Sequence, residues 1–385
     1  MRDILDQPRA LEATLQGLGV PDGLPLILGR LERKELGRVV LTGMGSSLYA
    51  LHPLHTLLTS RGFTTLLVET SELVYYLSRL LDCQTLIVAV SQSGRSAEII
   101  RLLDENARRA PIIAVTNTDD SPLALQADSV LLTRAGQEFS VSCKTYVTAL
   151  MALRHLGSLL TNAEQVSFPR KACPELAEGR ESTPHTFSDG PEQTNASFPR
   201  KRESTPEASG DAADETFSEL AQAAPAVRGY LDCWRDHVVE LAACLEGVRH
   251  LFLVGRGGSL AAVGTGALTI KESTHRHAEG MSSAAFRHGP LEMLSEGTFV
   301  IVFAGDEKTR ALNTRLLEDI RQKGGRAELL GINAQLSSLR IPEVPESALP
   351  ILEILPAQMV TLALAAQTGR EAGRFTLGSK VTTIE

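Results

Sequence analysis

Short apolar runs alternate with amphipathic stretches along most of the chain. In the first half, each run is followed by a turn and a helical pattern, and the runs predict strands at residues 39–42, 64–68, 85–91, 112–116 and 129–132. In the second half, similar runs predict strands at residues 250–254, 299–304, 327–332 and 351–355. This alternation is typical of parallel sheets covered by helices on both faces. We therefore expect an α/β protein.

The alternation stops between residues 167 and 211. This stretch is rich in Pro, Ser, Thr and charged residues, and the letters SFPRKRESTP at 197–206 repeat SFPRK and RESTP from 167–184. Such a polar repeat cannot bury enough surface to fold, so we expect a disordered inter-domain insert. The predicted organisation is a helical lead-in, a first domain, an insert with its linker, a second domain and a C-terminal tail, at residues 1–24, 25–163, 164–224, 225–365 and 366–385.

The two halves resemble each other. The segment VLTGMGSSLYA at 40–50 aligns without gaps on FLVGRGGSLAA at 252–262, and the aligned residues share two glycines, a serine, two leucines and an alanine. This likeness indicates one α/β unit that has been duplicated in tandem.

Two hydroxyl-rich turns follow predicted strands of the first half. A Ser/Gly turn that opens a helix presents free backbone N–H groups and the positive end of the helix dipole, which suits a phosphate. Helix capping by serine is the alternative explanation, although two such turns at one sheet edge favour a ligand. In both halves, leucine stands where the glycine-rich fingerprint of dinucleotide-binding proteins has its third glycine, which argues against a dinucleotide site. The turns contain Ser47, Ser91, Gln92, Ser93 and Ser96.

Charge and composition restrict the partners. Acidic residues outnumber basic residues by 46 to 38, which argues against broad affinity for nucleic acid or an anionic membrane. No signal peptide or run of about 18 apolar residues is present, and the five cysteines form no CxxC pair. His275 and His277 stand two residues apart and would point apart on a helix. We expect a cytoplasmic protein without metal, cofactor, nucleic acid or membrane partner.

Four motifs resemble the sugar-isomerase (SIS) domain family. They are SQSGRSAE at 91–98, GALTIKESTHRHAE at 266–279, FRHGPLEM at 286–293 and GSKVTTIE at 378–385. The chain is especially similar to the isomerase half of glucosamine-6-phosphate synthase and to stand-alone amino-sugar-phosphate deaminases and fructosamine-phosphate deglycases. The resemblance implies two tandem flavodoxin-like domains, each with a parallel sheet flanked by helices.

The resemblance also implies roles for individual residues. Ser47, Ser91, Gln92, Ser93 and Ser96 would hold the phosphate of a sugar-phosphate substrate. Glu272 would move a proton between C1 and C2, a task for a carboxylate whose pKa an apolar setting raises. His288 would open the sugar ring near neutral pH, and Lys380 would reach the carbonyl end of the sugar. The resemblance further implies a homodimer in which the histidine is lent to the partner's active site.

Two positions depart from the synthase pattern. Thr269 and Thr265 stand where the synthase carries a lysine and a glutamate, three and seven residues before Glu272. We expect the protein to lack the amidotransferase domain of the synthase, and we therefore expect a glucosamine-6-phosphate deaminase-like enzyme. The alternatives are a fructosamine-6-phosphate deglycase, the isomerase subunit of a glutamine-fructose-6-phosphate aminotransferase, and a non-catalytic sugar-phosphate sensor.

Overall fold

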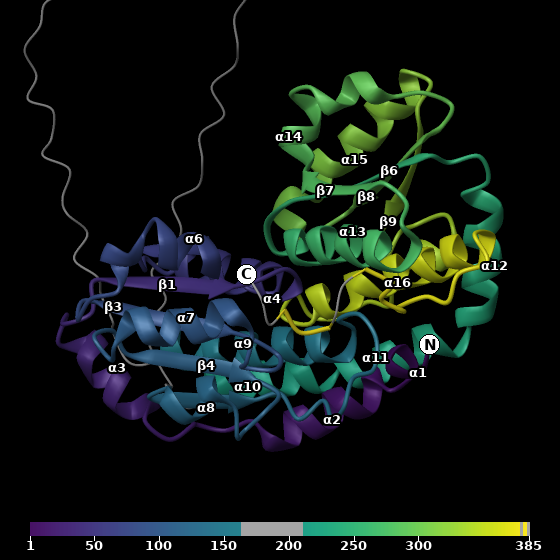
Figure 1. Ribbon diagram of the computed structural model, residues 1–385. Coiled ribbons are helices and arrows are strands. Elements are labelled where there is room, and N and C mark those ends of the chain that lie inside the picture. The colour runs from purple at the N-terminus through teal and green to yellow at the C-terminus, as the bar shows by residue number, and fades with distance from the viewer. Residues whose placement is uncertain (163–210, 378–379, 383–385) are drawn as a thin grey trace, which may run out of the picture.

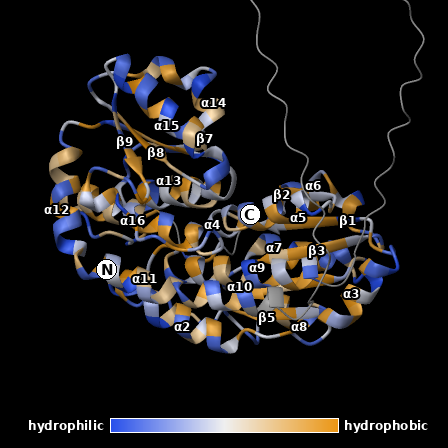
Figure 2. Cartoon of the chain, turned by 180° about the vertical axis from the view of Figure 1, so that it is seen from behind, coloured by the Kyte–Doolittle hydropathy of each residue, from blue (hydrophilic) through white to orange (hydrophobic). Residues whose placement is uncertain are grey.

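Two α/β domains lie side by side in the structure, a computed structural model that describes residues 1–162, 211–377 and 380–382 (Figure 1). The expected insert at 167–211 lies outside the described residues except for Asp211, at which a helix begins. Each domain contains its own parallel sheet. Figure 2 shows mostly hydrophobic strands inside both domains and hydrophilic residues on the outer helices.

The first sheet has the strand order β2-β1-β3-β4-β5, and every pair is parallel. This is the flavodoxin-like order, so the expected fold is confirmed. The strands are β1 (Arg38–Gly43), β2 (Thr65–Glu69), β3 (Thr85–Val90), β4 (Ile112–Thr116) and β5 (Ser129–Leu132). The helices are α1 (Arg2–Leu5), α2 (Gln7–Gly17), α3 (Leu24–Glu32), α4 (Ser46–Tyr49), α5 (His52–Ser60), α6 (Thr70–Tyr75), α7 (Ala97–Asn106), α8 (Pro122–Gln126) and α9 (Lys144–Asn162).

The second sheet has the order β7-β6-β8-β9, which repeats the first four positions of the first sheet. A parallel bridge between Gly331 and Arg340 continues the edge at which the first sheet has its fifth strand. The strands are β6 (His250–Gly255), β7 (Ala278–Ser282), β8 (Thr298–Phe303) and β9 (Arg326–Leu330). The helices are α10 (Asp211–Ala221), α11 (Ala223–Asp232), α12 (Trp234–Cys244), α13 (Leu260–Thr274), α14 (Ser283–Arg287), α15 (Glu307–Gln322) and α16 (Leu349–Gln367).

The prediction of a strand at 351–355 is wrong, because these residues lie inside α16. A short apolar run has no periodicity that separates a buried strand from a buried helix. α16 is mostly apolar around its circumference, and other elements bury nearly all of it; Glu353 is its one ionisable residue. By length and composition it could cross a membrane, but 78% of its apolar window is buried inside the structure. The pattern also missed β7, an edge strand that is mostly half-buried and lacks an apolar run.

The end of the expected linker is helical as well. α10 and the start of α11 occupy residues 211–224, which the composition had assigned to the insert and its linker. Leu220, Ala223 and Val227 are fully buried in the core of the protein. Leu220 lies on α10, whereas Ala223 and Val227 lie one turn apart on the same face of α11. α10 packs against α9, and α11 packs against α2.

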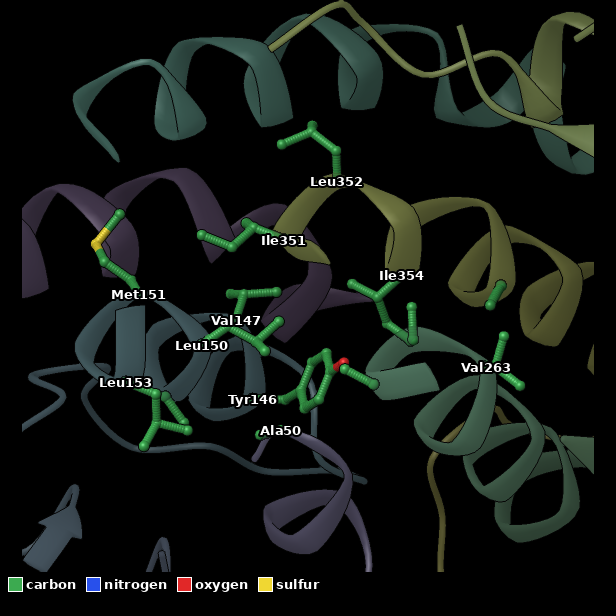
Figure 3. Packing of buried hydrophobic residues seen from close by; sticks show 14 of the residues in the cluster. Ala50, Tyr146, Val147, Leu150, Met151, Leu153, Val263, Ile351, Leu352 and Ile354 are labelled. Carbon is green, nitrogen blue, oxygen red and sulfur yellow. The ribbon is translucent and has the colours of Figure 1, made fainter. Parts of the chain in front are cut away.

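One continuous apolar core joins the two domains. α9 of the first domain packs against α16, and α16 packs along α13 of the second domain. Figure 3 shows Tyr146 and Leu150 of α9 gathered with Ile351 and Ile354 of α16 and with Val263 of α13. The relative position of the domains therefore depends on buried aliphatic contacts between these helices.

Gly280 provides a test of how closely β7 packs on α13. A Cβ atom at this position would lie 2.4 Å from the backbone oxygen of Val263. Gly280→Ala is expected to lower the free energy of unfolding by about 1–3 kcal/mol, because backbone must move to admit the methyl group. Urea denaturation measures the change.

Gly229→Ala is the matched control. Gly229 lies inside α11, and no atom is within 4 Å of its added Cβ position. Alanine should stabilise the exposed helix position by up to about 1 kcal/mol. Equal unfolding midpoints for the two variants would contradict the close approach of β7 and α13.

Candidate active site

A cavity of about 350 Å³ opens at the carboxyl ends of β1 and β3. Its wall combines the turns after these strands, the loop before α9, one side of α13 and the C-terminal tail. Seven of the eight site residues expected from the sequence line it: Ser47, Ser91, Gln92, Ser93, Ser96, Glu272 and Lys380. The fold thus brings residues separated by more than 300 positions into one site.

The turn between β3 and α7 is folded by its own hydroxyl groups. Ser91 Oγ accepts a hydrogen bond from the N–H of Gly94 (3.1 Å), and Ser93 Oγ accepts one from the N–H of Arg95 (3.3 Å). Gly94 has a φ of +59°, and a Cβ atom there would collide with Ser121. Ser96 precedes α7 and makes no capping bond with its side chain among the described residues. Ser96 lines the cavity at the start of α7, where the N–H of Ala97 already donates to the carbonyl of Thr382 in the C-terminal tail (3.1 Å).

The turn after β1 forms the neighbouring part of the cavity. Gly45 adopts a φ of +53°, and the chain enters α4 directly afterwards with Ser46 and Ser47. The N–H of Ser47 donates to the carbonyl of Met44 (3.0 Å), which holds the turn closed. Because β1 and β3 are adjacent in the sheet, both serine-rich turns face the same space.

Glu272 enters the cavity from α13 of the second domain. Leu268 lies one helical turn earlier and lines the same cavity, so the carboxyl group has an apolar neighbour on its own helix. Burial raises the pKa of Glu272 to about 7, and the adjacent Lys271 offsets part of this effect. A carboxyl group with this pKa can accept and return a proton near neutral pH.

Lys380 is held in the cavity by an acidic residue that sequence reasoning missed. Its Nζ donates to Glu138 Oε2 (2.9 Å) and to the carbonyl of Ser140 (2.8 Å). Glu138 is buried, and it also accepts hydrogen bonds from the N–H groups of Cys143 and Thr145 and from the Thr145 hydroxyl. Its position after β5, at the carboxyl edge of the sheet, was the signal that could have identified it.

The loop that carries Glu138 is tied to the N-terminal helix. Asp3 is buried and its Oδ2 accepts from the N–H groups of Phe139 and Ser140 and from the Ser140 hydroxyl. Lys144, also buried, pairs with Asp6 at 2.7 Å. Residues at the start of the chain therefore set the position of this wall of the cavity.

His288 is not brought into this cavity. It follows α14 on the second domain, it is exposed, and it is not among the described residues that line the site. Within one chain, the histidine expected to open the sugar ring is thus separated from Glu272 and Lys380.

A sequence model of the SIS domain matches residues 33–159 and 245–367. These two segments coincide with the two parallel sheets and the helices around them. The chain belongs to the SIS domain family.

Curated relatives of this SIS protein include glutamine–fructose-6-phosphate aminotransferases. The one from Pyrococcus horikoshii is 27% identical over all of this chain and 57% of its own length. The one from Mycobacterium tuberculosis is 26% identical over all of this chain and 58% of its own length. The chain therefore spans less than two thirds of the relatives that it matches.

Solved structures share the fold. The C-terminal domain of glucosamine-fructose-6-phosphate aminotransferase from Francisella tularensis superposes with a TM-score of 0.76 at 18% identity, covering 97% of both chains. A glucosamine-6-phosphate deaminase from Thermotoga maritima gives a TM-score of 0.68 at 17% identity, covering 100% of this chain and 99% of the other. The likeness extends over both SIS domains.

The two threonines that depart from the synthase pattern lie away from the cavity. Thr265 and Thr269 are both buried on α13, and Thr269 Oγ1 donates to the carbonyl of Thr265 (2.9 Å). Neither is among the described residues that line the site. The replacement of charged residues by Thr265 and Thr269 therefore does not change the residues that line the cavity.

The raised pKa of Glu272 predicts a pH-dependent effect on stability. Between its ordinary value of 4.5 and about 7, the folded chain holds a proton that the unfolded chain has lost, so this residue lowers stability as pH rises through that range. Glu272→Gln should raise the urea midpoint at pH 8, and the difference should vanish near pH 4.

The exposed Glu318 on α15 supplies the control. Glu318→Gln removes the same charge without relieving burial, so its midpoint should follow that of the unmodified chain at both pH values. If E272Q changed the urea midpoint by the same amount at pH 4 and pH 8, the raised pKa of Glu272 would be contradicted.

Proposed function

We propose that this SIS protein is a sugar-phosphate enzyme that converts an amino-sugar phosphate to a ketose phosphate and ammonia, as a glucosamine-6-phosphate deaminase does. The observation that supports this most is the position of Glu272. A proton-accepting carboxyl group with a pKa of about 7 lines the same cavity as two serine-rich turns.

The charges in the cavity favour an amino sugar. The turns offer hydroxyl and N–H groups to the phosphate, and they need no cation for this purpose. Three carboxyl groups, Glu98, Glu138 and Glu272, line the cavity together with Lys380. Glu98 is buried and its Oε2 has no hydrogen-bond partner among the described residues. The ammonium group of an amino sugar would complement this acidic surplus.

The proposed reaction begins with the open-chain aldehyde. Glu272 takes the proton from C2 and a proton is returned to C1, so that the C1 aldehyde becomes an alcohol and C2 becomes an imine. Water adds to the imine carbon, the C–N bond breaks, and ammonia leaves with the ketose phosphate. Lys380, held by Glu138, lies in the cavity as a donor for the carbonyl end of the sugar.

A homodimer would complete the site. The exposed position of His288 leaves the described single chain without an imidazole in the cavity. We propose that a second copy supplies its His288 for ring opening and receives the same residue in return. A two-fold symmetric pair makes such an exchange reciprocal.

A second candidate is the isomerase part of a glutamine–fructose-6-phosphate aminotransferase. The whole chain aligns with slightly more than half of the length of curated aminotransferases, which supports this candidate. The same residues would act in the reverse direction, with fructose 6-phosphate and ammonia as substrates. Ammonia release and glucosamine 6-phosphate formation, assayed in parallel, separate the two directions.

Glu272→Gln should reduce ammonia release from glucosamine 6-phosphate by about 10²–10⁴-fold, because the amide cannot accept the proton of C2. In the unmodified protein, kcat/KM should rise with pH up to about 7 and then level off, as Glu272 loses its proton. A coupled assay for ammonia measures both effects.

Glu318→Gln, outside the cavity, should retain full activity in the same assay. Binding of the sugar phosphate without turnover by the unmodified protein would favour the sensor function. Release of ammonia from fructosamine 6-phosphate alone would favour the deglycase.

Mixed dimers test the shared site. E272Q and H288Q chains, co-expressed with different affinity tags, should each be nearly inactive alone. A random mixture should recover about a quarter of the normal specific activity, since each mixed dimer contains one site with both residues intact. No recovery in purified mixed dimers would show that His288 acts within its own chain, and full activity of H288Q alone would show that His288 does not act at all.

A further inference from the structure

A second cavity of about 280 Å³ lies at the carboxyl ends of β6 and β8. It occupies in the second domain the position that the candidate active site occupies in the first, as the duplication of the α/β unit would place it. Its opposite wall comes from α5 and α9 of the first domain. The cavity is therefore separate from the site that contains Glu272 and Lys380.

The two cavities differ in the turn after the second strand. Where β3 is followed by Ser91-Gln92-Ser93-Gly94, β8 is followed by Ala304-Gly305-Asp306-Glu307. Asp306 Oδ1 accepts from the N–H of Thr309 (3.0 Å) and from its hydroxyl (2.9 Å), so a carboxylate of the chain already caps α15. This helix start is occupied by the protein's own negative charge, and a phosphate would be repelled there.

A buried carboxyl group lines the second cavity and is only half satisfied. Glu353 is 1% exposed, and its Oε1 accepts from the Ser259 hydroxyl at 2.8 Å. Its Oε2 has no hydrogen-bond partner among the described residues, and the same is true of the nearby Ser347 hydroxyl. Buried polar atoms without partners are rare in proteins and are typical of sites that a ligand completes.

The titratable groups around Glu353 come from three parts of the chain. Asp306 follows β8 and Glu346 precedes α16, while α9 contributes Arg154 and the nearby phenol of Tyr146. Burial, with a contribution from Asp306, raises the pKa of Glu353 to about 8, so that it is protonated at pH 7 in the empty cavity. Three acidic groups thus line one side of the cavity.

Arg154 lies on the opposite wall. It is half-buried, and it makes no ion pair within 4 Å in the part of the chain that the structure describes. Its burial lowers its pKa because its guanidinium is partly desolvated. Among the described residues, Glu219 of α10 and Arg61 are the charged groups that act on Arg154 from the first domain's side. Its guanidinium lines, with the carboxyl groups, a cavity of about 280 Å³.

We propose that this second cavity binds a small zwitterion, with its ammonium group at Glu353 and Asp306 and its anionic group at Arg154. An amino-sugar phosphate and a free α-amino acid both carry this pair of charges. A metal ion fits less well, since no three acidic, His or Cys side chains among the described residues are grouped to hold one. The proposal does not depend on the reaction assigned to the first cavity.

Isothermal titration calorimetry at pH 7 tests the proposal. The full chain with Glu272→Gln serves as the host, because the substitution slows turnover and removes the other carboxyl group that titrates near neutrality. The probes are glucosamine 6-phosphate, L-glutamine and glucose 6-phosphate, which lacks an amine. We expect one equivalent of glucose 6-phosphate per chain, bound in the first cavity. Glucosamine 6-phosphate should bind with two equivalents if it fits the second cavity, and L-glutamine should bind with one equivalent if it fits there.

Glu353→Gln and Arg154→Met, each added to this host, should weaken binding in the second cavity about tenfold or more, because each removes a charge-assisted hydrogen bond. Binding at the second cavity should release close to one proton at pH 7, since an ammonium group deprotonates Glu353, and E353Q should abolish this release. Titration in two buffers with different ionisation enthalpies measures it. The glutamine side chain introduced at position 353 has nearly the same shape as a protonated glutamate and is uncharged. The melting temperature of E353Q at pH 7 should therefore equal that of the host.

One equivalent of L-glutamine identifies an amino-acid site, and a second equivalent of glucosamine 6-phosphate identifies a substrate-type site. The absence of both, or binding of either kind that E353Q and R154M leave unchanged, would overturn the proposal. Neither result alters the test of ammonia release, so the two proposals can fail separately.

Discussion

The packing of α9 against α16, and of α16 along α13, is the interaction on which both cavities depend. Each cavity takes part of its wall from the opposite domain: Glu272 of α13 faces the turns of the first domain, and Arg154 of α9 faces the turn after β8. Aliphatic side chains such as Leu150 and Ile354 close the interface between these helices. Because this core is apolar and close-packed, it fixes the positions of polar groups from the two domains relative to each other.

Buried carboxyl groups have different roles according to how they are satisfied. Glu138 accepts hydrogen bonds from two N–H groups, a hydroxyl and Lys380, so it organises a wall of the first cavity. Glu272 has an apolar neighbour on its helix, and burial raises its pKa to a value suited to proton transfer. Glu353 keeps one oxygen without a partner. Burial raises the pKa of both Glu272 and Glu353 and so favours their neutral acid forms.

Much of the first domain could be predicted because its strands are apolar runs separated by turns. The predictions for β4 and β5 agree with the structure at both ends. The errors arose where burial and sequence pattern do not correspond. α16 is surrounded by other elements and therefore lacks a polar face, β7 is an edge strand without an apolar run, and α10 follows a polar repeat that obscures its helical spacing.

The sequence by itself determined the duplicated α/β unit, the serine-rich turns and the identity of the carboxyl group on α13, because these are encoded in local spacing and motifs. Tertiary structure decided which distant residues meet. It joined Glu138 to Lys380, 242 positions apart, and left His288 outside the cavity of its own chain. It also made Glu353 a buried acid beside Ser259. Such pairings depend on how helices from two domains pack, and local sequence patterns do not reveal that packing.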